Sequence, residues 1–109
     1  MALARLSLAG YSCTLCQIKD HDAYIQTDAQ TLTLQVKTAS KTHKTSRSYA
    51  FHTPKKNVDV SDVFAFVAID LGAVVFRRGD ELTSVTTYIS PKEFMDEEQS
   101  MQKTFDSFK

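Results

Sequence analysis

Apolar and polar residues alternate most regularly in "TLTLQVK", residues 31–37. Successive side chains of a β-strand point to opposite faces, so the two leucines and the valine can share one face. The other face then carries Gln35 and Lys37, an amide and an ammonium group close together in the sequence. This pattern predicts a strand that has one face on a core and a polar face near its end.

Five other segments are rich in apolar and β-forming residues and are predicted to be strands. They cover residues 11–18, 23–27, 48–52, 63–69 and 73–78. The segment "VFAFVAI", residues 63–69, is apolar without interruption, so this strand should be buried on both faces. Turns are expected at residues 28–30 and 70–72, and a polar loop is expected at residues 38–47.

Helical patterns occur near both ends of the chain. Leucines at helical spacing predict a short helix over residues 3–10, which Gly10 is expected to terminate. A second helix is expected after Ser90, where "SPKE" fits a capping box. Its apolar stripe is expected either to cover this chain's own sheet or to contact a second subunit. The stripe consists of Phe94, Met101, Phe105 and Phe108.

A short helix, a set of mostly antiparallel strands and a final helix describe an α+β fold around a central sheet. The 109 residues fit one domain, residues 1–109, and no internal repeat divides them. A domain of this size buries roughly 65% of the surface that its unfolded chain exposes. It therefore needs neither a disulfide nor a metal ion in order to fold.

Charge is unevenly distributed, although the formal net charge is zero. Residues 37–56 include several basic side chains and no acidic one. Such a segment either contacts phosphate groups or forms a solvated loop. The candidates for contact with nucleic acid are Lys41, Lys44, Arg47, Lys55 and Lys56.

The two cysteines, Cys13 and Cys16, have a C-x-x-C spacing but no second pair to complete a zinc site. In a strand, residues three apart point to opposite faces, so both are expected to be ordinary core or surface residues. The sequence has neither a secretion signal nor an apolar run long enough to span a membrane. The expected location is intracellular and cytoplasmic.

An acidic residue is expected at the same end of the sheet as Gln35 and Lys37. If the hairpin closes at residues 29–30, Asp22 lies across from Lys37 and diagonal to Gln35. A carboxylate oxygen, an amide oxygen and the Val36 carbonyl suit Mg²⁺, with water completing the octahedron. Lys37 would then orient a metal-bound water or hold phosphate oxygens. The alternative is an ordinary surface Asp–Lys pair beside a glutamine.

Asp22 and the later "QVK", residues 35–37, resemble the motif of the PD-(D/E)xK nuclease superfamily. The spacing is most similar to the Q-x-K branch, known from group I intron homing endonucleases of cyanobacteria. The surrounding sequence fits as well, since "DAYI" opens the hairpin, "LQVKTAS" closes it and "VSDVFAFVAID" follows as a buried strand. The resemblance covers roughly residues 5–78.

This resemblance implies a restriction-endonuclease-like fold, in which an N-terminal and a C-terminal helix flank a central mixed sheet. It implies cleavage of DNA with Mg²⁺ or Mn²⁺, with Asp22, Gln35 and Lys37 as catalytic residues. Asp22, Gln35 and Val36 would hold the metal ion, and the basic residues would contact the DNA backbone. Relatives of this size usually act as homodimers or homotetramers, here with the C-terminal helix as the candidate interface. The implied substrates are a homing site or a four-way junction, in a phage or bacterial host.

Two features depart from the pattern of the superfamily. His21 stands where the proline of the motif is expected, and residues 1–10 lack the glutamate that many relatives carry on the first helix. Either Asp20 or an acid from a partner chain replaces it, or metal affinity is low, or catalysis is lost. His21 and His52 are candidates for a general base. Two alternatives therefore stay open. One is a non-catalytic nucleic-acid-binding module of the same fold, and the other is an interaction protein that acts through its C-terminal helix.

Overall fold

A computed structural model of the chain describes residues 2–15, 22–40, 47–53, 61–82 and 86–109. Within these ranges the α-helices are α1 (Ala2–Leu8) and α2 (Glu97–Asp106), and the 3-10 helices are η1 (Gly79–Glu81) and η2 (Pro91–Asp96). The strands are β1 (Ser12–Leu15), β2 (Ala23–Gln26), β3 (Thr31–Ala39), β4 (Tyr49–His52), β5 (Val63–Ala68), β6 (Ala73–Arg78) and β7 (Thr86–Ile89).

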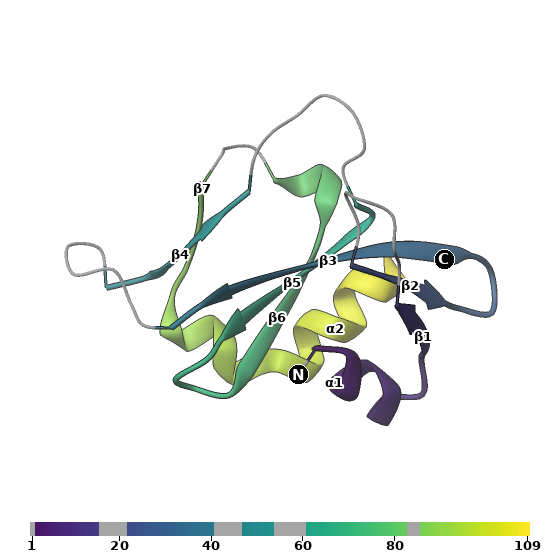
Figure 1. Cartoon of the computed structure of the whole chain (residues 1–109), viewed down its shortest axis with the longest axis horizontal. Helices are drawn as coiled ribbons and strands as arrows, with labels where there is room; N and C mark the ends of the chain where they lie inside the picture. Colours follow the sequence, from purple (N-terminus) through teal and green to yellow (C-terminus); the bar gives the residue numbers. More distant parts are fainter. Residues whose placement is uncertain (1, 16–21, 41–46, 54–60, 83–85) are drawn as a thin grey trace.

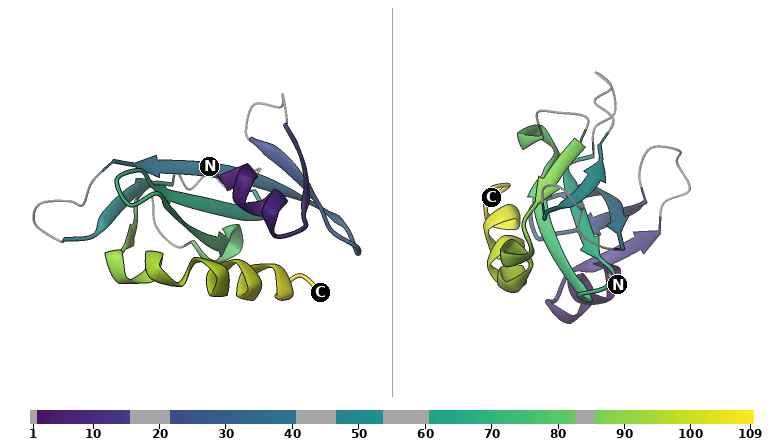
Figure 2. Two further views of the ribbon diagram at one scale, coloured as in Figure 1. Left: turned by 90° about the horizontal axis from the view of Figure 1, so that it is seen from below. Right: turned by 90° about the vertical axis from the view of Figure 1, so that its left-hand side faces the viewer.

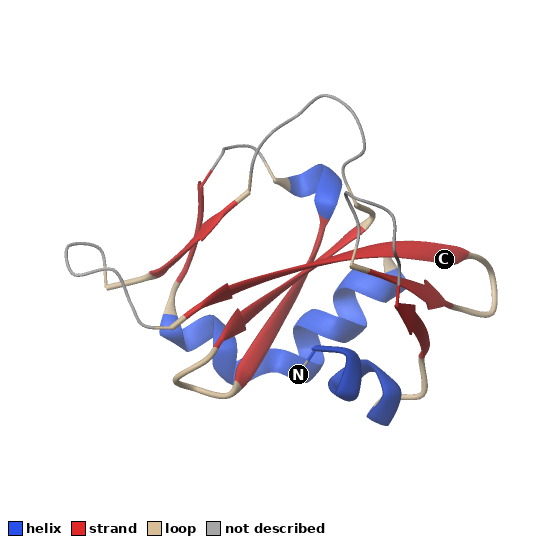
Figure 3. Cartoon of the chain, viewed as in Figure 1, coloured by secondary structure: helices blue, strands red, loops and turns tan. Residues whose placement is uncertain are grey.

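Five strands form the main sheet, in the order β1-β2-β3-β5-β6 (Figure 1). Neighbouring strands are antiparallel except β3 and β5, which run parallel. β4 and β7 pair antiparallel in a separate two-stranded ribbon (Figure 3). With one helix near each end of the chain, this is the α+β fold with a central mixed sheet that the sequence predicts.

The main sheet has a core on each face, and β5 contributes to both cores because all six of its side chains are buried. Val63, Ala65 and Val67 belong to a core with α1 and α2, which we call the helix side. Phe64 and Phe66 face the β4–β7 ribbon, which we call the ribbon side. Figure 2 shows α2 as a layer against the sheet, away from the ribbon. From Val63 to Ala68 the apolar segment is therefore a strand buried on both faces, as predicted, whereas Ile69 lies beyond the strand and is exposed.

Helix α1 ends at a glycine in the left-handed conformation, as the sequence predicts. Gly10 has a φ of 97°, where only glycine is unstrained. The Tyr11 N–H donates to the Leu6 carbonyl at 3.0 Å, and the Gly10 N–H donates to the Ser7 carbonyl at 3.1 Å. These two bonds form a Schellman motif, which satisfies carbonyls at the end of the helix and turns the chain into β1.

Side chains of helix α2 form hydrogen bonds with backbone groups of β6, the edge strand of the main sheet. The Glu97 carboxylate accepts the Val74 N–H at 2.8 Å, and the Ser100 hydroxyl accepts the Phe76 N–H at 3.2 Å. The Thr104 hydroxyl donates to the Phe76 carbonyl at 2.9 Å. An uncovered edge strand is a template for pairing with another chain, so these side chains protect β6 from such pairing.

The apolar stripe predicted for the last helix is divided between the two cores. Ser90 forms no side-chain capping bond, and the chain makes the 3-10 turns of η2 before α2 begins. These turns place Phe94 in the ribbon-side core, whereas Met101 and Phe105 are buried on the helix side and Phe108 packs partly against them. The predicted capping box is therefore not formed. The stripe covers this chain's own sheet and is not a free surface for a second subunit.

Some element boundaries also differ from the prediction. β7 was not predicted, because "TTYI" is a short segment that becomes a strand only through its pairing with β4. β3 extends into the predicted loop as far as Ala39, since β5 pairs with it up to this residue. The first strand is described only to Leu15. Cys13 is a half-buried free thiol packed against the helix-side core, and Cys16 lies outside the described residues.

A buried tyrosine ties the ribbon to the main sheet. The Tyr49 hydroxyl donates to the carboxylate of Asp70, in the turn between β5 and β6, at 2.7 Å. The Tyr49 ring also packs edge-on against Phe94, with 5.1 Å between the ring centroids. Burial, the hydrogen bond to Asp70 and the negative charge of Asp70 raise the pKa of Tyr49 to about 12.

Replacing Tyr49 with Phe is expected to destabilise the fold by about 2 kcal/mol, since a hydrogen bond to a charged group contributes roughly 1.5–3 kcal/mol. The substitution also removes a pH dependence. Because the pKa of Tyr49 is raised on folding from its ordinary value of about 10, the wild type should lose stability as the pH rises from 10 to about 12. Between about pH 10 and 12 the melting temperature should fall less steeply for Tyr49→Phe than for the wild type.

Tyr88→Phe is the matched control for this experiment. Tyr88 lies on the same ribbon, but its side chain is 55% exposed. If Tyr88→Phe flattens the pH profile as much as Tyr49→Phe does, the pH dependence does not come from the buried tyrosine.

Candidate functional site

The main sheet has a step on the β2 side of β3. β2 begins at Ala23, which pairs with Leu34, whereas β3 continues to Ala39. Beyond Leu34, the described part of β3 pairs with β5 and not with β2. Asp22 stands directly at this step, and residues 35–37 lie just beyond it. The sequence-predicted acid, amide and lysine are therefore brought to one place in the fold.

The register of the hairpin differs from the expected one by two residues. The turn is centred on residues 28–29, one position earlier than expected, and a backbone hydrogen bond of 2.9 Å closes it. Extending the observed pairing by one residue places Asp22 opposite Gln35 and diagonal to Lys37. The expected pairing of Asp22 with Lys37 is therefore wrong. A shift of two residues leaves Gln35 and Lys37 on the same face, while Asp22 lies at the end of β2 beside them.

The Asp22 side chain hydrogen-bonds the backbone of β3 at the position where a longer β2 would pair. The Asp22 N–H donates to the Leu34 carbonyl at 2.8 Å, and the Asp22 Oδ2 accepts the Val36 N–H at 2.6 Å. The N–H and C=O of one strand residue point to the same side, so the Val36 carbonyl also faces the open edge. Among the described residues, a carboxylate and a backbone carbonyl are thus presented together beyond the first residue of β2.

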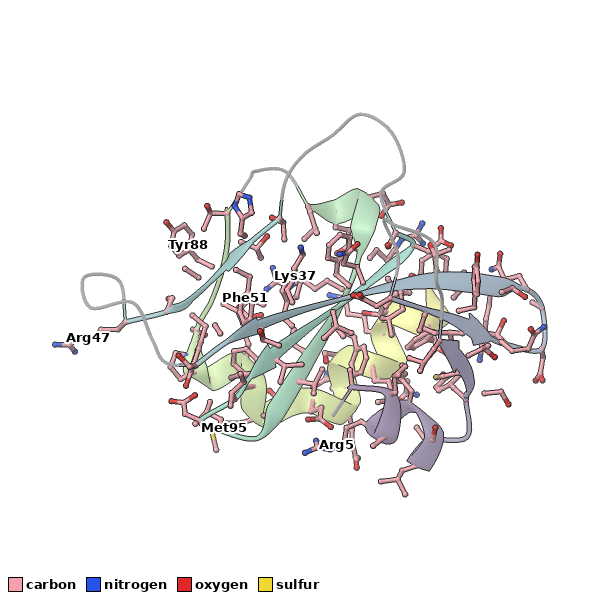
Figure 4. All side chains as sticks on the ribbon, in the orientation of Figure 1. Arg5, Lys37, Arg47, Phe51, Tyr88 and Met95 are labelled. Atoms are coloured by element: carbon pink, nitrogen blue, oxygen red, sulfur yellow. The ribbon has the colours of Figure 1, made fainter. Side chains whose placement is uncertain are left out.

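The side chains of Gln35 and Lys37 point to the ribbon side of the sheet. Val36 packs against the helix-side core, so its two neighbours must point the opposite way. Gln35 pairs in register with Phe64, and Lys37 with Phe66. Both polar side chains are half-buried. Figure 4 shows Lys37 on the side of β3 that faces β4.

Neither Gln35 nor Lys37 has a side-chain hydrogen bond or ion pair within the part of the chain that the structure describes. A half-buried ammonium group beside phenylalanine rings interacts more strongly with an anion than it would in bulk water. The amide oxygen of Gln35 is available to coordinate a cation or accept a hydrogen bond. The pair is therefore equipped to bind an external charged group.

The described oxygen atoms at the step suit a hard divalent cation, and Asp22 supplies the single carboxylate among them. Mg²⁺ takes oxygen ligands and is often held by one or two carboxylates together with waters and substrate phosphates. Asp22, the Gln35 amide and the Val36 carbonyl fit this description. Across the described ranges, no group of three or more His, Cys, Asp and Glu side chains could hold a metal ion. Mg²⁺ or Mn²⁺ therefore fits only with further ligands from water or substrate, while Asp20 and His21 lie outside the described residues.

The basic residues proposed for DNA contact are only partly placed. Arg47 is exposed and has a φ of 56°, which is uncommon for a residue with a side chain. Figure 4 shows Arg47 extending from the far end of β4, well away from Lys37. Arg47 is thus separate from the Asp22–Lys37 site. The other candidates, Lys41, Lys44, Lys55 and Lys56, lie outside the described residues.

His52 does not point toward the candidate site. The burial of β4 alternates, with Tyr49 and Phe51 buried and His52 exposed. Since the buried residues face the main sheet, His52 lies on the outer face of the ribbon. The expectation that His52 serves as a general base beside Lys37 is therefore not supported by its position.

Sequence reasoning overlooked Asp62, which fixes the start of the β3–β5 pairing. The Asp62 carboxylate accepts the Thr33 N–H at 3.0 Å and the Thr33 hydroxyl at 3.2 Å. The Asp62 N–H in turn donates to the Thr33 hydroxyl at 2.9 Å. Thr33 lies two positions before Gln35 on the same face, so this clamp positions the strand that carries the site. The sequence signal that could have identified Asp62 is an aspartate directly before an apolar strand. In the parallel register it lies opposite Thr33.

Comparison with solved structures identifies the fold. The chain is similar to a bacterial homing endonuclease, I-Ssp6803I, with a TM-score of 0.74 and 15% sequence identity. The match covers 96% of this chain and 84% of that chain. The chain has a nuclease fold. At this identity the likeness establishes the nuclease fold and not the activity.

The sequence comparisons found no match. No family model matches the chain, and no curated protein matches it. Among the described residues, no helix combines the length and apolar character that crossing a membrane requires.

Hydrogen exchange tests the contact that closes the step. In Asp22→Ala the Val36 amide loses its acceptor, so its exchange rate should rise by about tenfold or more. Asp22→Asn keeps an acceptor oxygen and should retain most of the protection. The Val67 amide, in the buried strand β5, reports global opening, so its change in each variant gives the loss of global stability, and the rise at Val36 should exceed it. Unchanged exchange at Val36 in Asp22→Ala would mean that this hydrogen bond does not form.

Proposed function

We propose that the protein is an Mg²⁺-dependent endonuclease that hydrolyses phosphodiester bonds in DNA, with Mn²⁺ as an alternative ion. The placement of Asp22, Gln35 and Lys37 at one step of the main sheet carries this proposal. The nuclease fold supports it, since it is shared with a protein described as a bacterial homing endonuclease. We further propose that the site is a Q-x-K variant of the PD-(D/E)xK type, because the three residues match that pattern.

Each residue has a role that its position supports. When bound, Mg²⁺ polarises the phosphate and lowers the pKa of a coordinated water. Asp22, the Gln35 amide and the Val36 carbonyl would hold the ion at the open edge of β3. Lys37 donates hydrogen bonds to phosphate oxygens as negative charge accumulates on them. A rigid strand holds Lys37 in place, so little reorganisation is needed during the reaction.

The proposed substrate is duplex DNA, either a continuous homing-type site or the arms of a four-way junction. Cutting both strands requires two such sites, so we propose a homodimer or homotetramer. The apolar stripe of α2 is buried in the chain's own cores, and the subunit contact must therefore use another surface.

A second candidate function is a non-catalytic DNA-binding module. The observation that favours it is the single carboxylate at the step, within a described chain that lacks a three-residue acid, His or Cys cluster. This module would keep the basic residues and Lys37 for phosphate contact but would not cleave. The burial of the apolar stripe of α2 speaks against an interaction protein that acts through that stripe.

Cleavage of labelled duplex and four-way junction DNA with Mg²⁺ or Mn²⁺ tests the proposal. Asp22→Ala and Lys37→Ala should each lower the cleavage rate by about 100-fold or more, because each removes a charged group from the transition state. DNA affinity, measured with Ca²⁺ in place of Mg²⁺, should change much less. Asp28→Ala removes an exposed acid from the turn of the same hairpin and should cleave normally.

The outcomes separate the two candidate functions. Wild-type protein that binds DNA but cuts neither substrate with either ion would favour the binding module. Full cleavage by Asp22→Ala or Lys37→Ala would mean that the chemistry takes place elsewhere.

A charge-reversal experiment tests the basic segment. Replacing Lys41, Lys44 and Arg47 with Glu should weaken DNA binding and make it less salt-dependent, by up to about three units in the slope of log K against log salt. The matched control reverses Lys92, Lys103 and Lys109, which are exposed and give the same change in net charge. Equal losses in both variants would attribute the effect to net charge alone. No loss in the first variant would remove the basic segment from the DNA-binding surface.

A further inference from the structure

The β4–β7 ribbon has one buried face and one exposed face. Tyr49, Phe51 and Ile89 are almost completely buried against the main sheet. Residues that alternate with them point outward, and among these His52 is exposed and Tyr88 is 55% exposed. Figure 4 shows Tyr88 on the outer side of the ribbon, away from β3.

His52 and Tyr88 are neighbours on this outer face. The ribbon pairs Ala50 with Tyr88 and His52 with Thr86, so His52 and Tyr88 are diagonal to each other and within reach of one ligand. Neither has a side-chain hydrogen bond in the described part of the chain. An imidazole and a phenol can each donate and accept hydrogen bonds, which is the chemistry that base edges offer in return.

The His52 end of the ribbon lies beside the candidate site. Phe51 precedes His52 in β4 and packs against Phe66 with 4.9 Å between ring centroids. Phe66 pairs in register with Lys37. The ribbon therefore forms a second layer on the face that carries Lys37. Lys37 and the His52 end of the ribbon are therefore close enough for one duplex to contact both.

The distribution of charge leaves the ribbon open to a polyanion. Residues 47–53 and 86–89 include Arg47 and His52 but no acidic side chain. Acidic residues instead occur on α2, which follows the β6 edge of the sheet (Figure 2). A face without acids is the one that DNA can approach with least repulsion. A two-stranded β-ribbon also has dimensions that the major groove of B-DNA admits.

We propose that the outer face of the β4–β7 ribbon enters the major groove of duplex DNA, where His52 and Tyr88 contact base edges. This inference rests on the proposed DNA function and assigns sequence preference to a surface separate from the cleavage site. Asp22, Gln35 and Lys37 act on the phosphate backbone, whereas the ribbon reads the neighbouring base pairs.

The test uses the full chain with Ca²⁺ in place of Mg²⁺. Random duplexes of roughly 30 base pairs are selected for binding to the wild type, and affinities for the selected and unselected pools are measured by fluorescence anisotropy. The double variant His52→Ala, Tyr88→Ala should bind the selected pool about tenfold more weakly and the unselected pool within about twofold of the wild type. Leu8→Ala is the matched control, because it truncates a side chain that is 86% exposed on α1.

Each outcome decides the proposal. Circular dichroism and thermal melting check that the double variant folds, which is expected because both side chains are exposed. Unchanged affinity for the selected pool, or an equal loss for both pools, overturns the ribbon assignment and leaves the nuclease proposal intact. A wild type that binds DNA but enriches no sequences overturns base reading as well. A wild type that binds no duplex overturns both the ribbon assignment and the proposed function.

Discussion

The candidate site depends on the parallel pairing of β3 with β5. No side chain of β5 is exposed to water, so packing on both faces fixes the position of this strand. β3 pairs with β5 from Leu34 to Ala39, and this span includes the backbone of residues 35–37. The Asp62–Thr33 clamp holds the start of the same pairing. Polar side chains on a strand held in this way keep their geometry better than they would on a loop.

The other edge of β3 shows how a strand can extend beyond its neighbour while the Val36 N–H keeps a hydrogen-bond acceptor. A buried or half-buried N–H that lacks a partner costs free energy, so a strand edge that is left open needs an acceptor from elsewhere. Asp22 provides that acceptor for Val36 with one carboxylate oxygen. Its second oxygen needs no backbone partner at this position. The same side chain therefore stabilises the step and offers a ligand to a cation.

The sequence predicts these features where a local pattern decides them. Alternation in residues 31–37 identifies both faces of β3, and the uninterrupted run at 63–69 identifies a strand buried on both faces. Gly10 is recognised as the end of α1 because few residues other than glycine adopt its φ. The placement of Asp22 beside residues 35–37 follows from the hairpin, whereas the convergence of the three side chains stays a prediction.

Features that depend on tertiary contacts were not predictable in the same way. The register was misplaced because "DAQ" is a weak turn signal, and both possible centres keep the apolar residues inward. β7 has little apolar pattern of its own and forms through pairing with β4. The predicted start of the last helix is wrong for a related reason. Burial of Phe94 in the ribbon-side core competes with a regular helix from Ser90, and the chain forms 3-10 turns instead.

The charge balance of the step bears on when a metal ion would bind. Among the described residues, one carboxylate and one ammonium group balance in charge, so these two groups attract a divalent cation weakly before substrate arrives. A DNA phosphate adds a negative charge and an oxygen ligand, and Mg²⁺ commonly takes substrate phosphates as ligands. Lys37 favours the approach of the phosphate and opposes that of the free ion. For a site of this composition, the proposed ion and the DNA should therefore bind cooperatively. The missing acid on α1 would then affect affinity for free metal more than the geometry of the DNA-bound state.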